Sequence, residues 1–139
     1  MFSQEAALRR KNRPLVFLIL SLIILGVILN VTRVFPTINF DINTDEISRI
    51  EIFSHGQTAV ISQEDDIIQI TENINSLTLE PNSDTGIGFI YRLTFYGDDN
   101  SILGQMDITS STSLKGYSVI DGRIDFNILK EVFEKAKAW

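Results

Sequence analysis

The spacing of apolar residues divides this chain into two parts. Leu15 to Val31 form one apolar run that contains no charged side chain. From about residue 46 onward, apolar residues recur at every second position or at every third and fourth position. A run that is apolar on all sides is typical of a membrane helix, whereas the periodic part is typical of a folded domain.

The periodic part predicts a mixed α+β domain. Alternating apolar residues predict strands, and His55-Gly56 between the first two strands predicts a hairpin turn. Apolar residues at three- and four-residue intervals predict two helices, the first capped by Ser62 and the second by Asp125. The predicted strands cover residues 47–53, 57–62, 77–81, 89–96, 101–108 and 114–120, and the first helix covers residues 63–76.

The order of these elements is ββαβ(β)ββα. We expect an antiparallel sheet of four to six strands, with two helices packed on one of its faces. In the strand 89–96, alternation places Tyr91 and Phe95 on the inner face. In the next strand, the residues expected to align on one face are Ile102, Met106 and Ile108.

The whole chain is expected to have four parts. Residues 1–13 form a cytoplasmic tail, 14–35 a transmembrane signal anchor in the lipid bilayer, 36–45 a linker and 46–139 the extracytoplasmic α+β domain. At about 1.5 Å per residue, the apolar run spans roughly 26 Å, which is at the short end of the spanning range.

Basic residues on the two sides of the apolar run predict its orientation. Arg9, Arg10, Lys11 and Arg13 precede the run, whereas Arg33 alone follows it closely. Because positive charge is retained on the cytoplasmic side, we expect a cytoplasmic N-terminus and an extracellular C-terminal domain at the cell membrane.

A cleavable signal peptide and a buried core helix are the alternatives to an anchor. A signal peptidase site needs small residues near the end of the run, and residues 28–34 offer none at the required spacing. The sequence contains no cysteine, which excludes a lipid anchor on that residue. A core helix would have one apolar stripe and not an apolar surface all round. These features favour an uncleaved anchor.

Charge and cysteine content narrow the class of protein. Residues 34–139 carry seven basic and 17 acidic side chains, which argues against nucleic acid as a partner. A small domain that is stable outside the cytoplasm without disulfides is typical of bacteria. Ordinary solubility is the alternative explanation for the acidity of this part.

Several short stretches follow one another in a particular order over residues 47–134. They are Ile50-Glu51-Ile52, Ile67 to Leu77, Tyr91 to Tyr96 with the following Asp-rich turn, Ile108, Gly116-Tyr117, and Asp121 to Leu129 with Phe133. Together they resemble an uncharacterised family of small extracytoplasmic domains in membrane-anchored or secreted proteins of Gram-positive bacteria. The resemblance implies one extracytoplasmic domain and no particular activity, cofactor or site residue.

The residue types that usually carry chemistry form no recognisable catalytic or metal-binding motif. His55 is the single histidine and lies at a predicted turn. Asp98, Asp99 and Asn100 suggest calcium, but the glycine and glutamate of the EF-hand pattern are absent at the required spacing. The acids Glu64 to Asp66 suit the start of a helix. We therefore expect no cofactor, no metal and no catalytic residue.

One candidate contact patch follows from alternation in the strand 89–96. If Tyr91 and Phe95 point inward, Ile90, Arg92 and Tyr96 point outward. Exposed aromatic and apolar residues beside an arginine are typical of a protein-binding surface. Cover by a helix or loop is the alternative explanation for these residues.

Three functional hypotheses remain. The first is a non-catalytic domain, tethered at the membrane, that binds an unknown membrane or cell-envelope protein or polymer. The second is a hydrolase that acts on envelope material, for which the candidate carboxylates are Glu64, Asp66, Asp98, Asp99, Asp107 and Asp121. The third is a structural accessory subunit of a membrane complex. We expect the first, and not an enzyme.

Overall fold

The computed structural model describes residues 18–24 and 36–137. The chain divides into two compact units, Met1–Phe35 and Pro36–Trp139. Residues 18–24 are helical. No helix among the described residues has both the length and the apolar character needed to cross a membrane. Most of the predicted anchor, 14–35, and the residues Arg9, Arg10, Lys11, Arg13 and Arg33 that orient it lie outside the described residues.

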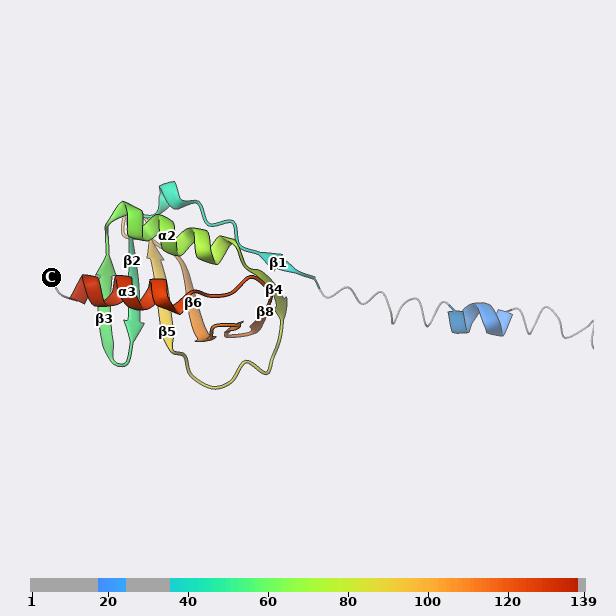
Figure 1. The fold of residues 1–139 in the computed structure, drawn as a ribbon. Helices are drawn as coiled ribbons and strands as arrows, with labels where there is room; N and C mark the ends of the chain where they lie inside the picture. Colours follow the sequence, from blue (N-terminus) through green and yellow to red (C-terminus); the bar gives the residue numbers. More distant parts are fainter. Residues whose placement is uncertain (1–17, 25–35, 138–139) are drawn as a thin grey trace, which may run out of the picture. The chain divides into compact units, whose positions relative to one another are not determined.

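The second unit is built on one antiparallel sheet (Figure 1). Every strand pair in it is antiparallel, and the order across the sheet is β1-β4-β8-β7-β6-β5-β2-β3. The strands are β1 (Ile38–Asn39), β2 (Arg49–Ser54), β3 (Gln57–Ile61), β4 (Thr78–Pro81), β5 (Tyr91–Tyr96), β6 (Ile102–Ser110), β7 (Ser113–Leu114) and β8 (Tyr117–Asp121).

Two α-helices, α2 (Glu64–Asn75) and α3 (Phe126–Lys137), lie over the same face of this sheet (Figure 1). A short 3₁₀ helix, η1 (Thr44–Glu46), precedes β2. The expected α+β class with an antiparallel sheet is confirmed. The sheet has eight strands and not four to six. The two-residue strand β1 was not predicted, and the predicted strand 114–120 is interrupted after Leu114, so that β7 and β8 are separate strands.

The core fills the space between the sheet and these two helices. Alternate residues of the central strands are buried, including Ile50 and Ile52 of β2 and Leu93 of β5, which have no exposed area. From the helices, Ile70 of α2 and Val132 of α3 are buried against them. The strand residues buried at every second position therefore pack against the buried residues of α2 and α3, which recur at three- and four-residue intervals, and together they form one apolar layer.

The segment expected to be a linker, 36–45, contributes to the fold. β1 pairs with β4, with Ile38 opposite Leu79. Phe40 and Ile42 are partly buried and pack against the core. Ile38, Phe40 and Ile42 alternate with polar residues, which is a strand-like pattern that is easily overlooked in a stretch rich in Asn and Asp.

The helix caps confirm one prediction and contradict another. The Asp125 carboxylate accepts hydrogen bonds from the amides of Asn127 at 2.9 Å and Ile128 at 3.3 Å, as expected for an N-cap. At α2 the N-cap is Gln63 and not Ser62, and no side chain caps the helix. The three acids of the first turn supply the favourable interaction with the helix dipole instead.

The expected alignment of Ile102 with Met106 and Ile108 is wrong. Tyr96 pairs with Ile102, but Phe95 pairs with Gly104, so β6 carries one extra residue at this point. Such a bulge shifts the side-chain alternation by one position. Ile102 therefore lies on the same face as Tyr96 and is 63% exposed, whereas Ile108 is fully buried.

Candidate interaction surface

The sheet face opposite the helices is the candidate site, and we call it the open sheet face. It consists of the outward side chains of four neighbouring strands, all of them partly or largely exposed. No helix of the second unit lies over it within residues 36–137 (Figure 1). Its residues are Arg49, Glu51, Phe53, Thr58, Val60, Arg92, Thr94, Tyr96, Ile102, Gln105 and Asp107.

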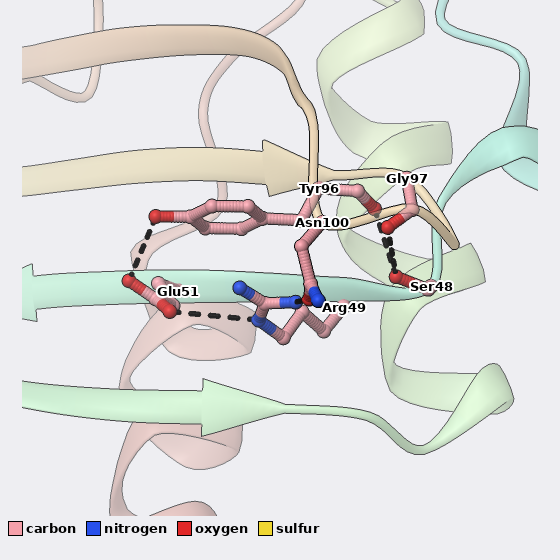
Figure 2. A network of polar contacts seen from close by, with 6 residues as sticks. All are labelled: Ser48, Arg49, Glu51, Tyr96, Gly97 and Asn100. Carbon is pink, nitrogen blue, oxygen red and sulfur yellow. Dashed lines mark hydrogen bonds and ion pairs between the residues drawn. The ribbon is translucent and has the colours of Figure 1, made fainter.

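One arginine–aromatic stack joins β2 to β5 (Figure 2). The Arg49 guanidinium lies 3.9 Å from the centroid of the Tyr96 ring, and the two residues are opposite one another in the sheet. Glu51 holds both groups, because its carboxylate is 3.5 Å from Arg49 Nε and accepts a hydrogen bond of 3.2 Å from the Tyr96 hydroxyl. The Asn100 side-chain oxygen accepts a further bond from Arg49. Both the ring and the cation are thus fixed in position.

The end of this stack is anchored by Ser48 (Figure 2). The Ser48 hydroxyl donates to the carbonyl oxygen of Gly97 at 2.8 Å, and the Ser48 amide donates to the carbonyl oxygen of Tyr96 at 2.8 Å. Asn100 has a φ of 61°, in the left-handed region that Asn tolerates better than most residues. The tight turn 97–100 therefore places the Asn100 side chain beside Arg49.

A second stack lies further along the same face. The Arg92 guanidinium is 4.3 Å from the centroid of the Phe89 ring, and it forms two hydrogen bonds with the Asp107 carboxylate, at 2.6 and 2.9 Å. Phe53 packs against Phe89 with ring centroids 5.9 Å apart. Arg92 and Asp107 are opposite one another on β5 and β6, so the register of the sheet itself creates this pair.

The two stacks alter the titration of their members. Hydrogen bonding from Arg92 holds the pKa of Asp107 below its usual value. The same bond raises the pKa of Arg92. Loss of solvent around Tyr96, followed by its hydrogen bond to Glu51, raises the pKa of the phenol. At neutral pH Asp107 is therefore ionised, Arg92 is charged and Tyr96 is neutral.

The structure brings two of the three predicted patch residues into this surface. Arg92 and Tyr96 both lie on the open sheet face, one in each stack. Ile90 precedes β5, is 37% exposed and bonds through its backbone to Ile108 and Ser54. Sequence reasoning did not assign Arg49, Glu51, Phe53 or Asp107 to this surface, nor Phe89 to the stack with Arg92. Alternation in β2 places Arg49, Glu51 and Phe53 on one face of that strand. The sequence does not show that β5 lies beside β2, and so it does not place these residues beside Arg92 and Tyr96.

The candidate carboxylates of the hydrolase hypothesis are distributed over several elements. Asp107 is paired with Arg92, and Asp66 accepts from Lys135 at 2.9 Å. Asp99 has a lowered pKa because the hydroxyl and amide of Ser101 bond to it. Within residues 18–24 and 36–137, no three acidic, histidine or cysteine side chains are grouped so that they could hold a metal ion.

The single histidine forms a local hydrogen bond. His55 Nδ1 lies 2.8 Å from the hydroxyl of Ser54, which itself donates to the carbonyl oxygen of Ile90 at 2.8 Å. Because that hydroxyl has one proton, Nδ1 must be the donor to Ser54. His55 has a φ of 49° at the first position of the hairpin turn. Its contacts are those of a turn residue.

A hollow of about 300 Å³ lies at the end of β3. Its wall includes the ion pair between Asp66 and Lys135. The other lining residues are Val60, Ile61, Ser62, Gln63 and Ala136. This hollow was not expected from the sequence, because α2, α3 and β3 contribute residues from distant positions in the chain.

Comparison of the chain with protein-family models, with curated proteins and with solved structures finds no match. The resemblance to a family of Gram-positive bacteria therefore remains a prediction from the sequence motifs.

Proposed function

We propose that this chain is a single-pass membrane protein whose extracytoplasmic domain binds a protein partner through the open sheet face. The observation that carries the binding role is the pair of arginine–aromatic stacks on a face that neither α2 nor α3 covers. The membrane role rests on the basic cluster and apolar run at the N-terminus.

The composition of the open sheet face suits a protein partner. Arginine and aromatic residues are enriched at protein interfaces and contribute most of the binding energy there. Val60 and Ile102 add apolar area, since they are 51% and 63% exposed on the same face. The surface carries positive and negative side chains in pairs, Arg49 with Glu51 and Arg92 with Asp107. It therefore offers specific polar contacts to a partner and is not uniformly positive or negative.

Hydrogen bonds within the site support a recognition role. Binding orders flexible side chains, and that ordering costs about 0.5–1.5 kcal/mol for each long side chain. Arg49 is already held by Glu51 and Asn100, and Arg92 by Asp107. These arginines therefore lose less freedom on binding than unpaired surface arginines.

The structural observations do not favour the hydrolase hypothesis. A general acid at neutral pH needs a raised carboxyl pKa, whereas the pKa values of Asp99 and Asp107 are lowered. Asp66 is held by Lys135. We therefore place the functional surface on the sheet face and not on these carboxylates.

The topology can be tested with single cysteines, because the natural sequence has none. Intact cells that express Asp98→Cys or Gln4→Cys are treated with a membrane-impermeant maleimide. We expect Asp98→Cys to be labelled directly and Gln4→Cys only after permeabilisation. Equal labelling of both variants, or labelling of Gln4→Cys alone, contradicts the proposed orientation. The unmodified chain controls for background.

The binding surface can be tested with Thr94→Lys, which introduces a charge between the two stacks without removing any of their members. Gln69→Lys adds the same charge on exposed α2 and is the matched control. We expect a protein that co-purifies with the wild-type chain and Gln69→Lys from native membranes to be lost with Thr94→Lys. The surface assignment fails if Thr94→Lys, folded by circular dichroism, retains every partner.

A further inference from the structure

In the part of the chain that the structure describes, one edge of the sheet has no strand beside it. β3 is the last strand in the sheet order, and among residues 36–137 it pairs with β2 alone. The opposite end of the sheet is β1, which has two residues and therefore offers little edge. β3 has five residues and is the longer of the two edges.

The hairpin geometry determines which backbone groups of β3 point toward this edge. Its turn consists of His55 and Gly56, so that Ser54 and Gln57 are the first pair. In such a hairpin, successive pairs alternate between hydrogen-bonded and non-hydrogen-bonded. Gln57, Ala59 and Ile61 therefore bond to β2, and the N–H and C=O groups of Thr58 and Val60 point away from it.

β3 carries none of the features that usually prevent an edge from pairing. Such features are lysine or other charges, proline, and bulges that twist the strand. Residues 57–61 contain no charge and no proline, and their pairing with β2 has no register shift. The side chains of Thr58 and Val60 are exposed. Among residues 36–137, no other strand has to be displaced for a second strand to bond to this edge.

We propose that β3 pairs with β3 of a second copy of this chain, antiparallel, about a two-fold axis at Ala59. The two sheets then become one continuous sheet, and each copy presents the same surface to the other. In this register Thr58 lies opposite Val60 of the second copy, and Ala59 lies opposite Ala59 of the second copy.

In this register, the side chains of β3 in one copy are complementary to those of β3 in the second copy. Thr58 and Val60 are both β-branched, and such pairs stabilise neighbouring strands. Ala59 is 2% exposed on the helix-covered face, and its methyl group is small enough to face its own copy. No charged residue meets a like charge within the paired segment, because residues 57–61 are uncharged.

The hollow at the end of β3 also fits a second copy. Ile61 lines it, together with the Asp66 and Lys135 ion pair of 2.9 Å. In the antiparallel register, Gln57 of the second copy lies opposite Ile61, on the helix-covered face. A glutamine has an apolar stem and an amide that both donates and accepts, which matches a hollow with apolar and charged walls.

Charge selects the antiparallel direction. Glu64 and Asp65 are exposed directly after β3, at the start of α2. A parallel pairing would bring these acids beside the same acids of the second copy. The antiparallel pairing places them beside the turn His55-Gly56 of the second copy, which contains no acid.

The test is a charge exchange at two exposed positions of the full-length chain. Thr58→Lys with Val60→Lys places a lysine opposite a lysine across the interface in both symmetry-related pairs. Thr58→Glu with Val60→Lys places a glutamate opposite a lysine instead. The two double variants differ at residue 58 alone. Gln69→Lys with Ile87→Lys adds two charges at exposed positions outside β3 and outside the open sheet face, and is the matched control.

The mass of each variant in detergent is measured by analytical ultracentrifugation over a range of concentrations. We expect wild type and the control to dimerise, the Lys/Lys variant to bind itself roughly tenfold or more weakly, and the Glu/Lys variant to recover the dimer. Hydrogen exchange at the Thr58 and Val60 amides should slow as the wild-type chain dimerises.

Three results would overturn the proposal: a wild-type chain that stays monomeric, a dimer that Lys/Lys leaves unchanged, or a Glu/Lys variant no better than Lys/Lys. A dimer that Lys/Lys leaves unchanged would point to another interface, such as the apolar run, and a failed rescue by Glu/Lys would contradict the register in which Thr58 lies opposite Val60. Thr58 and Val60 also belong to the open sheet face, so Thr94→Lys, which leaves β3 unchanged, is the variant that tests partner binding separately from dimerisation.

Discussion

The side-chain amide of Asn75 forms two hydrogen bonds with the backbone of Ile42, each of 2.9 Å. Asn75 Nδ2 donates to the carbonyl oxygen of Ile42, and Asn75 Oδ1 accepts from its amide. Asn75 is the last residue of α2, and Ile42 lies in the segment that joins β1 to η1. The Asn75 side chain thereby satisfies the two Ile42 backbone groups that a neighbouring strand would otherwise bind. Together with the pairing of β1 and β4 and the packing of Phe40 and Ile42 against the core, this contact joins residues 38–46 to the domain.

Replacing Asn75 should therefore destabilise the domain. Asn75→Ala leaves one donor and one acceptor of the Ile42 backbone without a partner, and we expect a loss of about 2 kcal/mol in the free energy of unfolding. Asn127→Ala, at an exposed position of α3, is the control. Urea unfolding followed by circular dichroism measures both. Equal stability of the two variants would show that Asn75 does not hold this segment.

The pair of Arg92 and Asp107 should stabilise the domain in a pH-dependent way. Because the folded state lowers the pKa of Asp107, the stabilisation is present above the pKa of an unfolded aspartate, about 3.9, and is lost as the pH falls through the lower folded value. We expect Asp107→Asn to flatten the decrease of the urea midpoint below about pH 4. Asp98→Asn, at an exposed turn, serves as the comparison. If the urea midpoint of Asp107→Asn falls at low pH as steeply as that of the unmodified chain, the pair of Arg92 and Asp107 is not the source of this pH dependence.

Gly122 should be less replaceable than Gly56, although both have positive φ, 80° and 76°. A Cβ at Gly122 would lie 3.0 Å from the carbonyl oxygen of Ser76, whereas a Cβ at Gly56 would meet nothing within 4 Å. We expect Gly56→Ala to cost about 1 kcal/mol from the left-handed backbone alone, and Gly122→Ala roughly 2–3 kcal/mol. Thermal or urea unfolding distinguishes the two. Identical losses would mean that the loop at Gly122 moves freely.

The two helix starts should respond differently to loss of a polar side chain. Asp125→Ala removes the acceptor of two α3 amides and should cost about 1 kcal/mol. Ser62→Ala should change the stability by less than about 0.5 kcal/mol, since no side chain caps α2. A large effect at Ser62 in urea unfolding would indicate that this hydroxyl caps α2 after all.

Elements whose pattern is local were predicted well from the sequence. The hairpin of β2 and β3, the strand β5 and the helices α2 and α3 each have an uninterrupted period of two or of three to four residues. The Asp125 cap was also recognisable, because a cap depends on three or four neighbouring residues. The errors lie where the pattern is short or broken: β1 has two residues, and the bulge in β6 reverses the face of Ile102.

The candidate site depended on contacts that no local pattern contains. Alternation predicted that Arg92 and Tyr96 share a face, which follows from β5 alone. Their partners, Arg49 and Asp107, come from β2 and β6, and only the strand order brings them alongside.

The sequence by itself determined the class of the domain, the positions of its longer elements and a charged, then apolar, N-terminus. These properties arise from neighbouring residues along the chain. Only the tertiary structure decided that β2 lies between β3 and β5, that Arg49 stacks on Tyr96, and that β3 is left at an open edge. Strand order depends on how the whole core is closed and which surfaces the helices cover, and that is a property of the packed chain and not of any segment of it.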